Sequence, residues 1–214
     1  HVEGLPPKPS PTELRADVAT FACRLHLAGR DAESLRGVDI GEKEAAAMAH
    51  GLRTNGDIAT LDLSDSTIHA SAAAVLAGVL GTDAVPVHNL NRLIFARCPL
   101  GDAVAGVLWG CLGRLRVVHL DVRSTLLSPA AGQTLARALT QSPECPLQHL
   151  NLAGNSLLST GAAAVAGALR SAPALQVLNL DGNGIDDDGA RALAEGLRES
   201  PSLVSLHLAG NEIG

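Results

Sequence analysis

Apolar and polar positions alternate in a pattern that returns at a fixed interval in the C-terminal part of the chain. The pattern L-x-x-L-x-L-x-x-N ends at Asn155, Asn183 and Asn211, which are 28 residues apart at each step. The alternating leucines predict a short strand, and the alanine-rich segment after each of the first two asparagines predicts a helix. A period in the range of about 20 to 50 residues is the signature of a solenoid, in which neighbouring units bury each other's apolar faces.

A weaker form of the pattern begins at Ile58, Leu90 and Leu115. With Leu115 as its first apolar position, the third of these units has Arg123 at the asparagine position. The predicted helices share a column of leucines at Leu52, Leu80, Leu112, Leu139, Leu169 and Leu197. A second column holds Ala49, Ala77, Trp109, Ala136, Ala166 and Ala194. Alanine in this column predicts that each helix lies close to its strand, and Trp109 is the exception.

The aspartate-rich turn within residues 177–197 has two chemical alternatives to a repeat unit. As a calcium loop with Gly184 at the sixth position, it has Ala190 where a bidentate glutamate is required. As a dinucleotide-binding turn it has the wrong glycine spacing, and the carboxylates at residues 186–188 would repel a pyrophosphate. We therefore interpret these aspartates as the start of a helix, where negative charge is favourable.

The quoted segments "LNLDGNGIDDDGARALAEGL" and "LNLAGNSLLSTGAAAVAGAL" resemble the ribonuclease-inhibitor-like class of leucine-rich repeats. This class includes ribonuclease inhibitor, NOD-like receptors, Ran GTPase-activating proteins, tropomodulin-type actin caps and subunits of ciliary assemblies. The resemblance implies an α/β solenoid that is curved, with parallel strands on the concave face and helices on the convex face. It does not choose among these functions.

Composition argues against two classes of function, nucleic-acid binding and membrane insertion. The net charge of −6 argues against a basic nucleic-acid-binding face, and the longest apolar run is too short for membrane insertion. The cysteines Cys23, Cys98, Cys111 and Cys145 form no C-x-x-C motif, which favours free buried thiols in a reducing setting. We expect an intracellular protein, with the cytoplasm favoured and organellar or ciliary assembly open as alternatives.

The expected organisation has two parts. Residues 1–24 form an extended segment and a capping helix started by Ser10, Pro11 and Glu13. Residues 25–214 hold about six to seven repeats. The first repeat is expected to be degenerate with a long loop near residues 28–43, and the last is incomplete. We expect the natural protein to continue beyond Gly214.

The outward positions of the predicted strands form two rows across the concave face. The sequence assigns Asp62, Ile94, His119, Asn151, Asn179 and His207 to one row. It assigns Thr60, Arg92, Val117, His149, Val177 and Ser205 to the other. The predicted partner-binding residues are Asp62, Arg92, His119, His149, Asn151, Asn179 and His207.

Enzymatic chemistry is not expected. His119 and His149 lie on neighbouring predicted strands, where they can approach each other with Asn151 beside them. A zinc site needs a third or fourth ligand that the pattern does not supply. The sequence contains no G-x-S-x-G, P-loop or H-E-x-x-H motif, so no cofactor, metal or catalytic residue is predicted. We expect a non-catalytic scaffold or a subunit of a large assembly that binds protein partners. The alternative is the regulatory repeat region of a NOD-like receptor or a Ran-type GTPase-activating protein.

Overall fold

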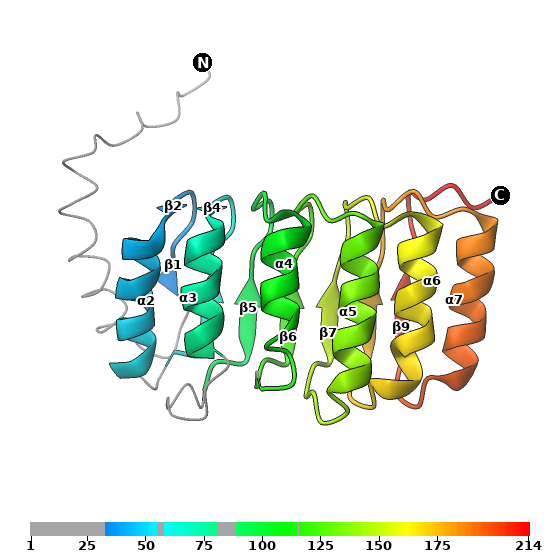
Figure 1. Cartoon of the computed structure of the whole chain (residues 1–214). Coiled ribbons are helices and arrows are strands. Elements are labelled where there is room, and N and C mark those ends of the chain that lie inside the picture. Colours follow the sequence, from blue (N-terminus) through cyan, green and yellow to red (C-terminus); the bar gives the residue numbers. More distant parts are fainter. Residues whose placement is uncertain (1–32, 55–57, 81–88, 115) are drawn as a thin grey trace, which may run out of the picture.

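The structure is a computed structural model that describes residues 33–54, 58–80, 89–114 and 116–214. The predicted division at residues 24 and 25, with the capping helix at Ser10, lies outside the described residues and stays a prediction. Within the described residues, short strands alternate with helices in a repeating order (Figure 1).

The strands form one parallel sheet in which each strand pairs with the next repeat's strand. Its order is β1 (Glu33–Ser34), β3 (Thr60–Asp62), β5 (Arg92–Ile94), β6 (His119–Asp121), β7 (His149–Asn151), β8 (Val177–Asn179) and β9 (Ser205–His207). A second, two-stranded sheet pairs β2 (Asp39–Ile40) with β4 (Thr67–Ile68). Sequential strands are therefore neighbours throughout the main sheet, as a solenoid requires.

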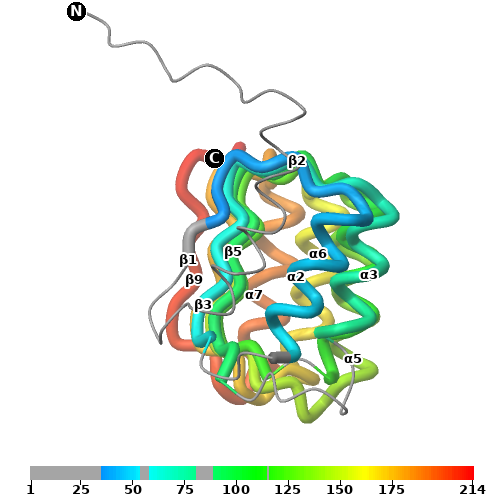
Figure 2. The backbone as a smooth tube through the Cα atoms, turned by 90° about the vertical axis from the view of Figure 1, so that its left-hand side faces the viewer, coloured from blue at the N-terminus to red at the C-terminus, as the bar shows by residue number. Residues whose placement is uncertain are grey.

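The helices form a second layer on one side of the sheet. They are α2 (Glu42–Thr54), α3 (Ala70–Leu80), α4 (Gly101–Trp109), α5 (Pro129–Gln141), α6 (Leu158–Ala168) and α7 (Asp187–Glu199), with a 3₁₀ turn η1 at Leu169–Ser171. The view in Figure 2 separates the strand layer from the helix layer. Strands pair at about 4.8 Å, whereas packed helices need about 8–10 Å, so the strand side is the inner, concave side of the solenoid.

The core lies between these two layers. The central residues of successive strands are in register, and Leu93, Leu120, Leu150 and Leu178 are each at most 2% exposed. On the helix side, the predicted leucine column is buried from Leu52 to Leu169 and emerges only at Leu197, which is 37% exposed. The apolar pattern of the sequence thus forms one continuous core.

Asparagine side chains satisfy the backbone where each strand turns toward its helix. The Asn155 side-chain oxygen accepts from the backbone N–H groups of Thr125 and Leu127 at 2.9 and 3.1 Å. Its amide donates to the carbonyls of Val122 and Leu152 at 3.0 and 2.8 Å, which joins two repeats. Asn183 and Asn211 occupy the same position in the following repeats.

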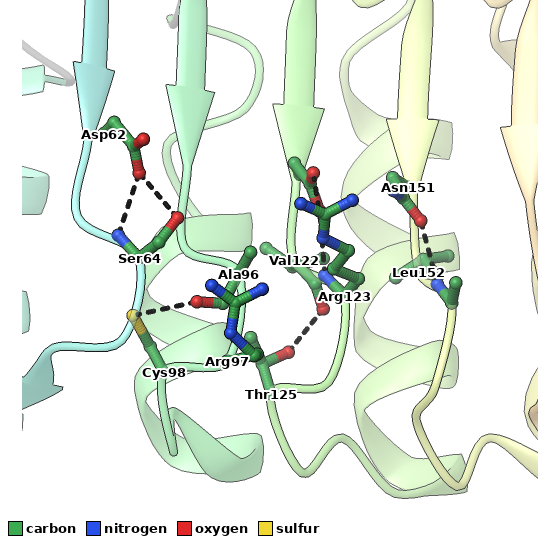
Figure 3. A network of polar contacts seen from close by, with 12 residues as sticks. Asp62, Ser64, Ala96, Arg97, Cys98, Val122, Arg123, Thr125, Asn151 and Leu152 are labelled. Carbon is green, nitrogen blue, oxygen red and sulfur yellow. Dashed lines mark hydrogen bonds and ion pairs between the residues drawn. The ribbon is translucent and has the colours of Figure 1, made fainter. Parts of the chain in front are cut away.

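Other small polar side chains replace asparagine in the earlier repeats. Cys98 occupies the asparagine position of its repeat, and its thiol donates to the Leu63 carbonyl at 2.9 Å. Ser66 does the same toward Leu35 at 3.0 Å, and Thr125 donates to Val122 at 2.6 Å (the Thr125 contact is drawn in Figure 3). The buried turns therefore keep a side-chain donor in every repeat from β3 to β9.

The aspartate-rich turn after β8 begins a helix, as the sequence predicts. The Asp186 carboxylate accepts from the backbone N–H groups of Asp188 and Gly189 at 2.9 and 3.0 Å, so it is the N-cap of α7. Asp187 and Asp188 fill the first turn, where the helix dipole favours negative charge. The aspartates of this turn therefore have the structural role of starting α7.

The first described repeat differs from its prediction. A long loop was expected near residues 28–43, but β1 and β2 lie within that range and pair with β3 and β4. The prediction was wrong because Glu33 pairs in register with the inward Leu61, so no leucine pattern marks this strand in the sequence. Residues 28–32 of the expected loop lie outside the described residues.

Glycine and alanine let neighbouring helices approach closely, with one interruption at α4. A Cβ added at Gly196 would lie 2.4 Å from the Ala166 carbonyl oxygen, and one added at Gly132 would lie 2.9 Å from the Gly161 Cα. By contrast, Trp109 fills the alanine column in α4, where it is 2% exposed. Its indole Nε1 has no hydrogen-bond partner within the described part of the chain. The bulk of Trp109 coincides with looser packing of α4 on α3 and α5 than between α5, α6 and α7.

Candidate functional site

The concave face carries the predicted site residues on outward positions of successive strands. Asp62 lies on β3, Arg92 on β5, His119 on β6, His149 and Asn151 on β7, Asn179 on β8 and His207 on β9. Arg92 and His207 are exposed, Asp62 is buried, and the other four are half-buried. Six strands therefore contribute to one surface on the side opposite the helices (Figure 2).

The rows across this face differ from the prediction at β6. His119 pairs in register with Arg92 and His149, whereas the row of Asp62, Ile94 and Asn151 continues through Asp121. The predicted place of His119 in the row of Asp62 was wrong, and the same two-residue shift puts Thr125, not Arg123, at the asparagine position. Two alignments of residues 115–122 with the repeat pattern each give three apolar inward positions. In the structure the inward residues are Val117, Leu120 and Val122, which are all buried.

The side chains of the row from Asp62 to Asn179 largely serve the fold. The carboxylates of Asp62 and Asp121 and the amide oxygens of Asn151 and Asn179 each accept from the backbone N–H two residues ahead, at 2.8–3.1 Å. Asp62 also accepts from the Ser64 hydroxyl at 2.5 Å (Figure 3). These oxygens hold the turn that follows each strand, so they are less available to a partner than the sequence suggested.

Three arginines neutralise the carboxylates of the first four repeats on this surface. Arg36 contacts Asp62 at 3.0 Å, and Arg123 lies 3.6 Å from Asp121. Arg97 binds Asp65 through two contacts of 2.6 and 2.7 Å. Burial opposes ionisation of Asp62, but its hydrogen bonds from Ser64 and the Arg36 guanidinium outweigh this and lower the pKa of the carboxyl. Sequence reasoning missed these pairs, for which the only signal is the parallel register.

The Asp65–Arg97 pair sits on an unusual backbone. Asp65, Arg97 and Ser124 have φ angles of 63°, 60° and 54° at the turn position that Gly154, Gly182 and Gly210 occupy in the later repeats. This left-handed conformation favours glycine, so non-glycine residues there carry a conformational cost. The β3 and β5 repeats therefore present charged side chains at a turn where the last three repeats present bare backbone.

Arg92, His119 and His149 form a separate group in the other row. The rings of His119 and His149 stack with centroids 5.4 Å apart and an interplanar angle of 29°, so the predicted approach of these two residues is confirmed. None of the three makes an ion pair with a described residue. Burial lowers the pKa of His119, and repulsion from Arg92 and His149 lowers it further, against attraction from Asp121. Elsewhere on the face, His207 contacts the Ser205 hydroxyl at 3.1 Å.

The described residues do not gather three or more histidine, cysteine, aspartate or glutamate side chains into a group that could hold a metal ion. Cys98, Cys111 and Cys145 are free thiols, and Cys23 lies outside the described residues. Burial raises the pKa of Cys98 to about 11, so this thiol is a poor nucleophile near neutral pH. A bilayer-spanning segment is likewise not found among the described helices, since none combines the required length and hydrophobicity.

Comparison with known proteins agrees with this repeat geometry. A family model described as Leucine Rich repeat matches residues 172–194 and 199–214, which contain β8, the first turns of α7 and β9. No curated protein matches the chain. The unit of strand, polar turn and helix recurs in register along the rest of the described chain, with the same inward leucines. The chain therefore has the fold of a leucine-rich repeat solenoid.

Proposed function

We propose that this chain is a non-catalytic scaffold, or a subunit of a larger assembly, that binds a protein partner across its concave strand face. Leucine-rich repeats generally bind proteins, and a solenoid offers an extended surface made from many repeats. The observation that carries the proposal is the row of Arg92, His119 and His149. These polar side chains reach the concave surface without ion-pair partners among the described residues.

Two finer points belong to the same proposal. The steps of 28 residues, with alanine-rich helices, support the ribonuclease-inhibitor-like class of repeats. The three described free thiols support a reducing, intracellular compartment. Partner recognition then relies on area and polar fit, because among the outward strand positions that the structure describes only Arg92 belongs to the residue types that dominate protein hot spots.

The test compares two matched charge-reversal pairs in affinity capture from source extract, with quantitative identification of the captured proteins. Arg92→Glu with His149→Glu alters the strand face, and Arg191→Glu with Arg198→Glu alters exposed positions on α7. We expect the strand-face pair to lose a protein that the α7 pair retains, with melting temperatures of both near wild type. Loss through the α7 pair alone would place binding on the convex side and reject the proposal.

A further inference from the structure

The row of Arg92, His119 and His149 brings three nitrogen-donor side chains together on adjacent strands. Arg92 pairs in register with His119, and His119 with His149, so neighbouring members are one strand spacing apart, about 4.8 Å. The stacked rings of His119 and His149, 5.4 Å between centroids, fix the two imidazoles beside each other. The Arg92 guanidinium is exposed at one end of this group.

The charge around this group is unbalanced. Each carboxylate that the first four repeats place on the same side, at Asp62, Asp65 and Asp121, already has its own arginine within 3.6 Å. Arg92 is left without a carboxylate among the described residues. A chain with net charge −6 therefore presents a local excess of positive charge at the centre of its concave face.

We propose that the Arg92–His119–His149 group binds an acidic segment of the protein partner, through aspartate or glutamate carboxylates. This inference rests on the proposed function and specifies the chemistry of what the concave face binds. The Arg92 guanidinium can hold a carboxylate through two parallel N–H donors. The imidazole N–H groups of His119 and His149 then donate to a neighbouring carboxylate of the same segment.

Carboxylates fit this group better than phosphate esters. Phosphorylated motifs are recognised by clusters of arginines, which balance a charge of nearly −2 on each phosphate. Here Arg97, Arg123 and Arg36 are paired with aspartates, so Arg92 is the one arginine on the described strands that is left for a ligand. One guanidinium with two histidines matches singly charged carboxylates more closely.

Acidification should strengthen this binding. In the free protein, burial, Arg92 and His149 hold the pKa of His119 below its ordinary value, against Asp121 on the same strand. A carboxylate bound beside His119 favours its protonated form and raises that pKa. Binding then takes up a proton, so affinity rises as the pH falls through the pKa of the complex toward the lower pKa of the free protein.

The experiment is a titration of the isotope-labelled chain with a glutamate-rich peptide, followed by NMR signals of the histidine rings and backbone amides. A glutamine-rich peptide of the same length is the neutral control, and a phosphoserine-containing peptide tests the alternative ligand. Signals of His119 and His149 should shift with the glutamate peptide and not with the glutamine peptide. Affinity should rise about threefold to tenfold between about pH 7.5 and about pH 5.5, where histidine titrates.

Variants separate this group from general electrostatic attraction. Arg92→Gln should lower the affinity for the glutamate peptide about fivefold, as expected for the loss of an exposed ion pair. The double change His119→Gln with His149→Gln should remove the pH dependence while the protein melts near the wild-type temperature. The control Arg198→Gln removes an exposed arginine on α7 and should leave affinity unchanged.

Three results would overturn the inference: equal response to the glutamine peptide, preferential binding of the phosphoserine peptide, or equal loss through Arg198→Gln. The capture experiment distinguishes these failures from failure of the proposed function. A partner that is lost with Arg92→Glu and His149→Glu but is not displaced by the glutamate peptide would keep the concave face and reject the acidic segment.

Discussion

Replacing Asn155 with alanine tests whether the asparagine turn stabilises the solenoid in proportion to the backbone groups it satisfies. Asn155 is 7% exposed, and its side-chain oxygen is the acceptor for the buried N–H groups of Thr125 and Leu127. Asn155→Ala leaves both N–H groups without that acceptor. An unsatisfied buried donor costs about 1–3 kcal/mol, so the two together predict a loss of about 2–6 kcal/mol.

The carbonyl partners of Asn155 contribute less to this loss. After the change, the Val122 carbonyl still accepts from the Thr125 hydroxyl at 2.6 Å. The Leu152 carbonyl still accepts from the Asn183 amide at 3.0 Å. Neither oxygen becomes unpaired, so the predicted destabilisation comes from the two N–H groups.

Urea denaturation of wild type, Asn155→Ala and Asn151→Ala measures the effect. Asn151 is the matched control, because it is the same residue type nearby and accepts a single N–H, from Ala153 at 3.0 Å, at a half-buried position. Its loss should cost about 1 kcal/mol. Coincident transitions by circular dichroism and tryptophan fluorescence are the control, because a repeat array that unfolds in parts would give different transitions by the two probes. If Asn155→Ala destabilises the chain no more than Asn151→Ala does, the reasoning is refuted.

Three further predictions concern packing, pH and thiols. Gly196→Ala should destabilise by about 1–3 kcal/mol, since its Cβ would meet the Ala166 carbonyl at 2.4 Å. Gly167→Ala, with nothing within 4 Å, should stabilise by about 0.5–1 kcal/mol; thermal melts that rank the two equally would contradict this. Because folding lowers the pKa of Asp62, the ionised carboxylate stabilises the fold at pH values above 3.8, the pKa of an unperturbed aspartate. This contribution is lost as the pH falls through the pKa of the folded state. Asp62→Asn should therefore reduce the drop in melting temperature below about pH 4, and an unchanged drop would exclude Asp62 as its source. Dithiothreitol should leave the melting temperature unchanged, and Cys98 should react with thiol reagents only on unfolding, because burial raises its pKa to about 11; rapid labelling of the native chain would show otherwise.

The strand layer and the helix layer could be predicted from the sequence because each repeat carries its own leucine pattern for the strand and its own apolar pattern for the helix. Leucine spacing identifies the inward face of every strand, and any error in one repeat is limited by its neighbours. The contact between His119 and His149 could be predicted for the same reason, since adjacent strands and a shared face were both readable.

Row assignment at β6 could not be derived in the same way. The segment offers Leu115, Val118 and Leu120 or Val117, Leu120 and Val122 as three apolar inward positions, and both choices keep His119 outward. Only packing against the flanking repeats distinguishes them. Pairing then aligns His119 with Arg92, which is the basis of the inferred acidic-segment site.

The ion pairs of the concave face depend on geometry that spacing does not express. Asp65 and Arg97 are 32 residues apart and meet because both occupy the left-handed turn position of consecutive repeats. A pattern of leucines carries no information about that turn. Likewise, Asp62 and Asn179 appear in the sequence as free polar side chains, whereas backbone N–H groups occupy their oxygens.

The single tryptophan of the chain has an optical consequence. Trp109 is 2% exposed, and its Nε1 has no acceptor within the described residues, so its emission should lie at short wavelength, as for an indole in a dry hydrocarbon setting. It lies where helix packing is loosest, between the tightly packed repeats at α5–α7 and the earlier ones. Any partner that opens or closes the curvature at α4 would change the surroundings of this one chromophore. The emission wavelength of Trp109 would therefore report a change in the curvature of the solenoid at α4.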